Sequence, residues 1–155
     1  MAGVTYRAAT LDDLAALAGL RYEMQIEEAH DAARMTRAAY VAAYGATMRE
    51  EFARGRALAW LAEADGQAVA AVTLLWWVVP PSVEYPVRRR GQVSNVYTRP
   101  AYRRRGISRH LMELLLAAAR ELGVQRLVLW ASAMGQPLYT GLGFAPSRAL
   151  EIDFE

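Results

Sequence analysis

Three consecutive arginines, Arg103 to Arg105, are followed by Gly106 between a segment typical of a strand and a segment typical of a helix. A helix N-terminus already carries about half a positive charge from its aligned peptide dipoles, so more cations there are unfavourable unless an anion binds. The free amides of a first helical turn, approached through a glycine, attract phosphate groups. The pattern predicts a site for a pyrophosphate-like anion; its alternative is a solvated, arginine-rich turn.

Several other kinds of site are excluded by residues that the sequence lacks. It contains neither a Walker Gly-Lys-Ser/Thr motif nor a Gly-x-Gly-x-x-Gly motif. It has no cysteine, which excludes disulfides, thiolate catalysis and cysteine-ligated zinc. The two histidines, His30 and His110, are expected at or near the surface. We therefore expect no bound metal.

Length and charge point to a small globular protein rather than a nucleic-acid or membrane protein. The 155 residues suit a single domain, residues 1–155, and 54% of them are hydrophobic. A net charge of +2 gives only weak attraction to nucleic acids or anionic membranes. The N-terminus does not resemble a secretory signal, and the longest apolar segment is shorter than the ~20 residues of a membrane span. We expect a cytoplasmic protein.

The hydrophobic pattern predicts the elements that position the arginine-glycine turn. In order, we expect a strand (4–10), a helix capped by Thr10, a helix from Thr36 to about Arg54, two strands joined at Asp65-Gly66, a loop (82–91), a strand (92–98), a helix (about 104–122), a strand (126–132), a short helix (136–142) and a final alternating strand (148–155). Helices alternate with strands only in the second half, which indicates an α/β or α+β fold with a mixed sheet. The turn lies in its predicted right-handed strand–helix–strand crossover.

The residues around the turn resemble the acyl-CoA-binding motif of the GCN5-related N-acetyltransferases (GNAT), Gln/Arg-x-x-Gly-x-Gly/Ala. Arg103, Gly106 and Ser108 fill its three defined positions, although the family prefers Gly or Ala in place of Ser108. Downstream, Tyr139 and Gly143-Phe144 resemble a second motif of the family. The order of elements also matches the family fold, a mixed and mostly antiparallel central sheet flanked by helices, over nearly the whole chain.

The resemblance implies an acetyl-CoA-dependent N-acetyltransferase in which a primary amine of a small molecule or peptide attacks the thioester directly, in a ternary complex. Tyr139 would protonate the departing CoA thiolate. The implied cofactor-binding residues are Val96, Tyr97 and Thr98 along the pantetheine arm, Arg103, Arg104, Arg105, Gly106, Ile107, Ser108 and Arg109 around the pyrophosphate, and Ser132, where many members have an asparagine. Members of the family are often dimers, so the resemblance is compatible with a homodimer.

The general base and the acceptor are left open by the sequence. The strand before the turn has no carboxylate, so Glu84 on the preceding loop and a water relay through Asn95 are the two candidates. The acids Glu23, Glu27, Glu28 and Asp31 form either the solvated face of a helix or an acidic wall for a cationic amine. Of Trp76 and Trp77, one is expected in the core, and the other could line the acceptor pocket.

Two other functions compete with acetyl transfer. The lack of a clear base allows a non-catalytic acyl-CoA-binding or regulatory domain of the same fold, although Tyr139 argues against it. Nucleic-acid binding through Arg88–Arg90 and Arg103–Arg105 is disfavoured by the near-neutral net charge. The sequence does not identify the acceptor amine or tell whether other acyl groups are used.

Overall fold

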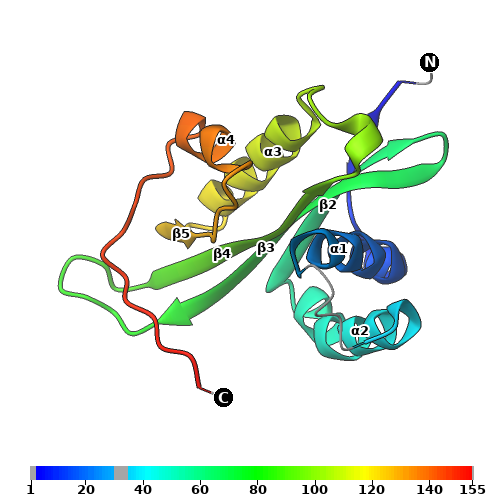
Figure 1. The fold of residues 1–155 in the computed structure, drawn as a ribbon. Coiled ribbons are helices and arrows are strands. Elements are labelled where there is room, and N and C mark those ends of the chain that lie inside the picture. The colour runs from blue at the N-terminus through cyan, green and yellow to red at the C-terminus, as the bar shows by residue number, and fades with distance from the viewer. Residues whose placement is uncertain (1–2, 30–34, 155) are drawn as a thin grey trace.

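A central mixed sheet separates two pairs of helices in the computed structural model, which describes residues 3–29 and 35–154 (Figure 1). His30 and Asp31 lie outside the described residues. The strands are β1 (Thr5–Ala8), β2 (Ala57–Ala64), β3 (Gln67–Val79), β4 (Arg88–Thr98) and β5 (Arg126–Val128). The helices are α1 (Leu14–Ala29), α2 (Arg37–Ala53), α3 (Ile107–Glu121) and α4 (Gln136–Gly141), with short 3-10 turns η1 (Leu11–Asp13) and η2 (Pro100–Tyr102).

The strands follow their sequence order across the sheet, β1-β2-β3-β4-β5. The first three pairs are antiparallel and β4 pairs with β5 in parallel, which confirms the predicted mixed, mostly antiparallel sheet. The β2–β3 hairpin turns at Asp65-Gly66, where both residues have positive φ, 51° and 74°. That geometry is the type I′ turn favoured between twisted antiparallel strands.

The predicted starts of the first two helices are confirmed by their caps. Thr10 and Asp13 form a reciprocal capping box before α1, and the Thr36 side chain accepts a hydrogen bond from the N–H of Ala39 at the start of α2. The Arg7 guanidinium also pairs with Asp13, and these contacts lower the pKa of that carboxyl to about 2. Local sequence signals therefore fix where α1 and α2 begin.

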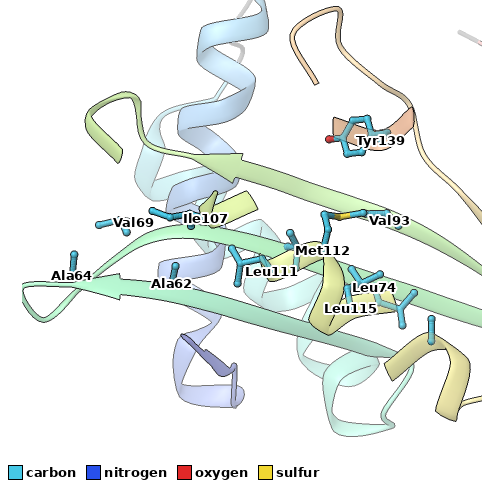
Figure 2. Packing of buried hydrophobic residues seen from close by; sticks show 13 residues of the cluster. Ala62, Ala64, Val69, Leu74, Val93, Ile107, Leu111, Met112, Leu115 and Tyr139 are labelled. Carbon is cyan, nitrogen blue, oxygen red and sulfur yellow. The ribbon is translucent and has the colours of Figure 1, made fainter. Parts of the chain in front are cut away.

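Each face of the sheet has its own core, because successive side chains of a strand point to opposite faces. Leu17 and Leu20 of α1 pack against Ala59, Leu61, Ala71 and Tyr97 on one face. On the other face, Figure 2 shows Leu111, Met112 and Leu115 of α3 beside Leu74 of β3 and Val93 of β4. In the part of the chain that the structure describes, no helix is long and apolar enough to cross a membrane.

Two predicted boundaries are wrong near the arginine clusters. The expected loop 82–91 ends earlier, since Arg88, Arg89 and Arg90 already belong to β4 and pair with β3. The helix expected from Arg104 begins at Ile107 instead. Arg104 and Gly106 have φ values of 64° and 76°, which a right-handed helix cannot contain.

The last two predicted strands are also corrected. The apolar segment 126–132 forms only the three residues of β5. The alternating segment 148–155 has no strand pairing over its described residues, and its apolar side chains Leu150, Ile152 and Phe154 are 97%, 74% and 86% exposed. Alternation becomes a strand only where a neighbouring strand and an apolar surface are available to it.

Candidate active site

A β-bulge in β4 organises the site. Ala71 faces Tyr97 and Thr73 faces Ser94, so β4 fits two residues, Asn95 and Val96, where β3 has one. Asn95 takes up the extra length with a φ of 56°. Such a bulge leaves one residue out of the ladder and shifts the alternation of side chains beyond it. As a result, Ser94 and the buried Asn95 both lie toward α1 and α2, while Val96 packs against the core on the α3 side.

Beyond the bulge, β4 has a free edge. Its parallel pairing with β5 runs only from Arg90–Arg126 to Gln92–Val128. The backbone of Val96, Tyr97 and Thr98 therefore has β3 on one side and, among the described residues, no strand on the other. An open edge of this kind can hydrogen-bond an extended ligand as an added strand does.

The turn after β4 presents a set of unused amides. Through η2, Arg104 and Gly106, the chain enters the 15-residue α3 with positive φ at both residues. Among the described residues, no backbone hydrogen bond takes up the N–H groups of residues 104 to 109. A Cβ added to Gly106 would have no atom within 4 Å, so the outside of the turn is open. Amides arranged in this way can donate hydrogen bonds to an anion.

Two of the three arginine side chains of the turn, those of Arg103 and Arg105, have partners within the protein. Arg103 donates to the carbonyl of Thr98 at 2.8 Å and to Glu27 at 2.7 Å. Arg105 donates to the carbonyl of Ala101 at 3.0 Å. The anion predicted for Arg103 is thus Glu27 in this structure. Among the described residues, the exposed Arg104 side chain has no such partner, so the free donors of the turn are its guanidinium and the backbone amides.

Three further residues predicted near the cofactor connect the elements around the turn. The hydroxyls of Ser108 and Thr98 lie 2.8 Å apart and join α3 to β4. The Arg109 guanidinium lies against α4, 3.1 Å from where a Cβ of Gly141 would be. Ser132 accepts a hydrogen bond from the N–H of Gly135 at 3.2 Å, which shapes the turn into α4.

Tyr139 of α4 is 8% exposed and belongs to the buried cluster on the α3 side of the sheet (Figure 2). Phe144 packs edge-on against its ring, with 6.1 Å between the ring centroids. A Cβ on Gly135 would come within 2.8 Å of the Tyr139 ring, so this glycine leaves room for it. Burial, and then the charge of Glu28, raise the pKa of Tyr139. The phenol is therefore a proton donor at neutral pH.

Glu84 is not brought together with the other predicted site residues. It is exposed in the loop between β3 and β4, at the opposite end of the sheet from the turn after β4 (Figure 1). The ten residue steps of β4, at about 3.3 Å each, put roughly 30 Å between the two ends of the strand. The geometry gives no support to Glu84 as the base.

Two of the three described acids of α1, Glu23 and Glu27, are paired with arginines, so they form no open acidic wall, whereas Glu28 is exposed to solvent. Glu23 binds Arg99 through two hydrogen bonds of 2.9 Å and also contacts Arg37. Glu27 accepts from Tyr97 and Arg103. These pairs hold the pKa values of both carboxyls below their usual range, against the effect of burial. They tie α1 to β4 and the turn.

Other candidates from the sequence lie elsewhere. Trp76 is half-buried and donates to the carbonyl of Gly55 at 2.8 Å, and Trp77 is 41% exposed. Neither belongs to a core cluster, so the expectation that one of them lies in the core is wrong. Arg89 donates to the carbonyl of Leu122 at the C-terminus of α3, where a cation is favourable. Among the described residues, no group of three or more His, Asp or Glu is placed to hold a metal ion.

A cavity of about 320 Å³ between α1, α2 and the sheet was not predicted. Arg21, Tyr44, Thr73, Ser94 and Asn95 are among the residues that line it. One signal was present in the sequence: Arg21 interrupts the apolar stripe of Leu17, Leu20 and Met24. The convergence of Ser94 and Asn95 depends on the bulge, for which the sequence offers one weak signal: asparagine tolerates the positive φ that Asn95 adopts.

Comparison with known proteins identifies the family. A model of the acetyltransferase (GNAT) family matches residues 22–144. The chain therefore belongs to this family, and it is an N-acetyltransferase of the acyltransferase class of enzymes. Comparison with curated proteins gives no match.

Solved structures agree with this assignment. A GCN5-related N-acetyltransferase from Ralstonia eutropha JMP134 is 31% identical, with a TM-score of 0.83 over 98% of this chain and 99% of that one. A predicted acetyltransferase from Clostridium acetobutylicum, in a structure with acetyl-CoA, is 25% identical, with a TM-score of 0.86 over 97% and 96%. A ribosomal-protein-alanine N-acetyltransferase from Brucella melitensis biovar Abortus 2308 shares the fold, at 24% identity and a TM-score of 0.69 over 99% and 100%.

Proposed function

We propose that this protein transfers the acetyl group of acetyl-CoA to a primary amine by direct attack in a ternary complex. The observation that carries the proposal is the free edge of β4 at Val96–Thr98, which leads into the unused amides of the turn before α3. One extended ligand with a pyrophosphate can use both. The similar structure from Clostridium acetobutylicum contains such a ligand, acetyl-CoA.

The proposed binding mode divides the cofactor between these two surfaces. The pantetheine arm would pair with the backbone of Val96, Tyr97 and Thr98. The pyrophosphate would accept hydrogen bonds from the amides of residues 104 to 109, where the α3 dipole also favours negative charge. Gly106 leaves space for close approach of the phosphates.

In the proposed reaction, the amine nitrogen attacks the thioester carbonyl carbon, a C–N bond forms and the C–S bond breaks. A backbone amide near Val96 or Tyr97 would stabilise the oxyanion. The sulfur leaves as a thiolate and takes the proton of the Tyr139 hydroxyl, while the amine loses a proton to a base. Holding both reactants in line supplies much of the rate enhancement.

For the base, we propose Glu28 rather than Glu84. Glu28 lies near enough for its charge to raise the pKa of Tyr139, and it is exposed at the C-terminal end of α1. Unlike Glu23 and Glu27, it has no ion-pair partner among the described residues. A water molecule could relay the proton from the amine to this carboxylate.

The test is thiol release from acetyl-CoA with a panel of amines, followed as a function of pH for the wild type and single variants. Tyr139→Phe should lower kcat by about 100-fold or more, with an unchanged thermal shift by acetyl-CoA. Because the pKa of Tyr139 is raised above 10.0, loss of its proton should not limit kcat below about pH 10. Unchanged turnover in Tyr139→Phe would refute its role as the acid.

The same assay separates the two carboxylates. Glu28→Gln should lower kcat most at the acidic end of the profile, where few amines are neutral, whereas the matched change Glu84→Gln should leave the profile unchanged. The opposite pattern would restore Glu84 as the base. Acetyl-CoA binding without thiol release from any amine would favour the non-catalytic alternative.

A further inference from the structure

The cavity between α1, α2 and the sheet has the size of a small-molecule site. Its volume of about 320 Å³ lies at the lower end of the range for ligand pockets. Its floor is the face of β3 and β4 that carries Thr73, Ser94 and Asn95, and α1 and α2 contribute Arg21 and Tyr44. Asn95 neighbours Val96, so the cavity reaches the segment of β4 where we place the thioester.

Among the described residues, the buried side-chain oxygen of Asn95 at this cavity has no hydrogen-bond partner, and the hydroxyls of Tyr44 and Thr73 have none except each other. Thr73 and Asn95 are only 2% and 4% exposed. Burial raises the pKa of Tyr44 to about 12, so its hydroxyl remains a donor. Buried polar groups are nearly always paired in native proteins, so these atoms need water or a polar ligand as a partner.

The orientation of Asn95 leaves an acceptor for that ligand. Its side-chain nitrogen donates to the carbonyl of Leu17 at 3.4 Å. The side-chain oxygen is therefore the free end of the amide, and it needs an N–H or O–H donor. A substrate amine would supply one.

The charge of the cavity comes from Arg21. Its guanidinium donates to the hydroxyl of Ser94 at 2.9 Å, and no carboxylate of residues 3–29 or 35–154 forms an ion pair with it. The nearby acids Glu23 and Glu27 are paired with other arginines. A half-buried guanidinium with spare donors selects for an anionic group such as a carboxylate.

We propose that this cavity binds the acceptor and that the acceptor is a small amine bearing an anionic group, of the size of an amino acid. The proposal rests on the proposed acetyl transfer and names its substrate class. Arg21 binds the anionic group, with the hydroxyls of Tyr44 and Thr73 as further donors, and Asn95 accepts an N–H of the amine. This orientation places the nitrogen at the bulge, beside Val96. The paired state of Glu23 and Glu27 argues against a polyamine.

The experiment compares matched amines in the thiol-release assay: amino acids, their carboxamides, the corresponding aminophosphonates, and a polyamine. For the wild type, kcat/KM should be about 10- to 100-fold higher for the carboxylates than for the carboxamides, as expected for a charged hydrogen-bonded pair. A preference for the phosphonates identifies that anion as the natural one. Equal or better turnover of carboxamides or polyamine overturns this proposal and leaves acetyl transfer intact.

Arg21→Gln should abolish the preference for the anionic amine and raise its KM, with the acetyl-CoA thermal shift unchanged. The control is Arg49→Gln, which removes the same charge from an exposed position of α2 outside the cavity and should keep the preference. A preference that survives in Arg21→Gln refutes the role of Arg21.

A binding measurement keeps the proposal testable if no amine turns over. Calorimetric titration of the amino acids should show saturable binding to the wild type and a loss of at least tenfold in affinity in Arg21→Gln. No binding to the wild type overturns the proposal. Binding without turnover supports this substrate class and refutes the proposed catalysis alone.

Discussion

Two glycines of this chain differ in whether their backbone conformation requires a glycine. Gly106 has a φ of 76°, in the left-handed region that other residues reach only at a cost, and it lies in the turn that leaves the amides of residues 104 to 109 without a backbone partner. Gly45 lies inside α2 without a positive φ, and a Cβ there would meet nothing within 4 Å. The first glycine is required by conformation, and the second weakens a helix.

Gly106→Ala should therefore lower Tm by about 2 to 8 °C, as expected for 1 to 2 kcal/mol of strain in a protein of this size. It should also weaken the thermal shift by acetyl-CoA. The matched change Gly45→Ala should raise Tm by about 2 to 4 °C, since alanine is the better helix former by about 1 kcal/mol. Equal effects of the two substitutions would show that the turn is not strained. The measurement is thermal unfolding monitored by circular dichroism.

Among the helices and strands, α1 is bound by ion pairs and a hydrogen bond to the segment that carries the proposed cofactor site. Its C-terminal half supplies Glu23 to Arg99 and Glu27 to Tyr97 and Arg103. The same helix contributes Arg21 to the cavity and the Leu17 carbonyl to Asn95. One helix thus connects the proposed acceptor cavity to the turn before α3, and its ion pairs with Arg99 and Arg103 hold the two in place.

These pairs predict a stability that depends on acid pH. Arg99 and then Arg37 lower the pKa of Glu23 from 4.5, so the unfolded chain takes up a proton there first as the pH falls. The contribution of the Glu23 carboxylate to the free energy of unfolding is present above about pH 4.5. It is lost as the pH drops through the pKa that Glu23 has in the folded state. At pH 7, Glu23→Gln should lower Tm by about 3 to 6 °C, and this difference should shrink between pH 5 and pH 2.

The control for this substitution is Glu50→Gln. Glu50 pairs with Arg54 on α2, but both side chains are more than half exposed, so the pair contributes about 0 to 1 kcal/mol. At pH 7, Glu50→Gln should change Tm by less than Glu23→Gln does. A pH-independent difference for Glu23→Gln would refute the linkage to its ionisation.

For the molecule as a whole, the described C-terminal segment contributes little to the fold. Leu150, Ile152 and Phe154 are largely exposed and have no strand partner among the described residues. Replacing all three with serine should change Tm by no more than about 2 °C, because exposed side chains carry little stability. Leu111→Ala, at a fully buried position of α3, should instead cost about 2 to 5 kcal/mol.

Size-exclusion chromatography with light scattering, alongside the unfolding curves, tests the same variant for the homodimer that the family resemblance allows. A large fall in Tm, or a change in mass on substitution, would contradict the prediction and show that the segment packs against a second copy. The expected result is an unchanged mass.

The sequence by itself determined the features that depend on near neighbours in the chain. The capping residues Thr10 and Thr36, the Asp65-Gly66 hairpin and the Arg103–Gly106 turn were all predicted from short-range chemistry. The family assignment followed from the motifs around Gly106 and Tyr139, and the family model confirms it. Such signals are readable because their physical causes lie within a few residues.

The tertiary structure alone decided what depends on distant contacts. A bulge at Asn95 reverses the alternation of β4, and no local signal sets which way the residues before and after it face. Arg99 and Arg103, which pair with Glu23 and Glu27, each lie 76 residues further along the chain, so the sequence pattern did not show that these acids form ion pairs. Segment 148–155 alternates like a strand, but pairing needs a neighbour that sequence pattern cannot supply. The cavity proposed for the acceptor forms only when α1, α2, β3 and β4 pack together, which contacts between distant parts of the chain decide.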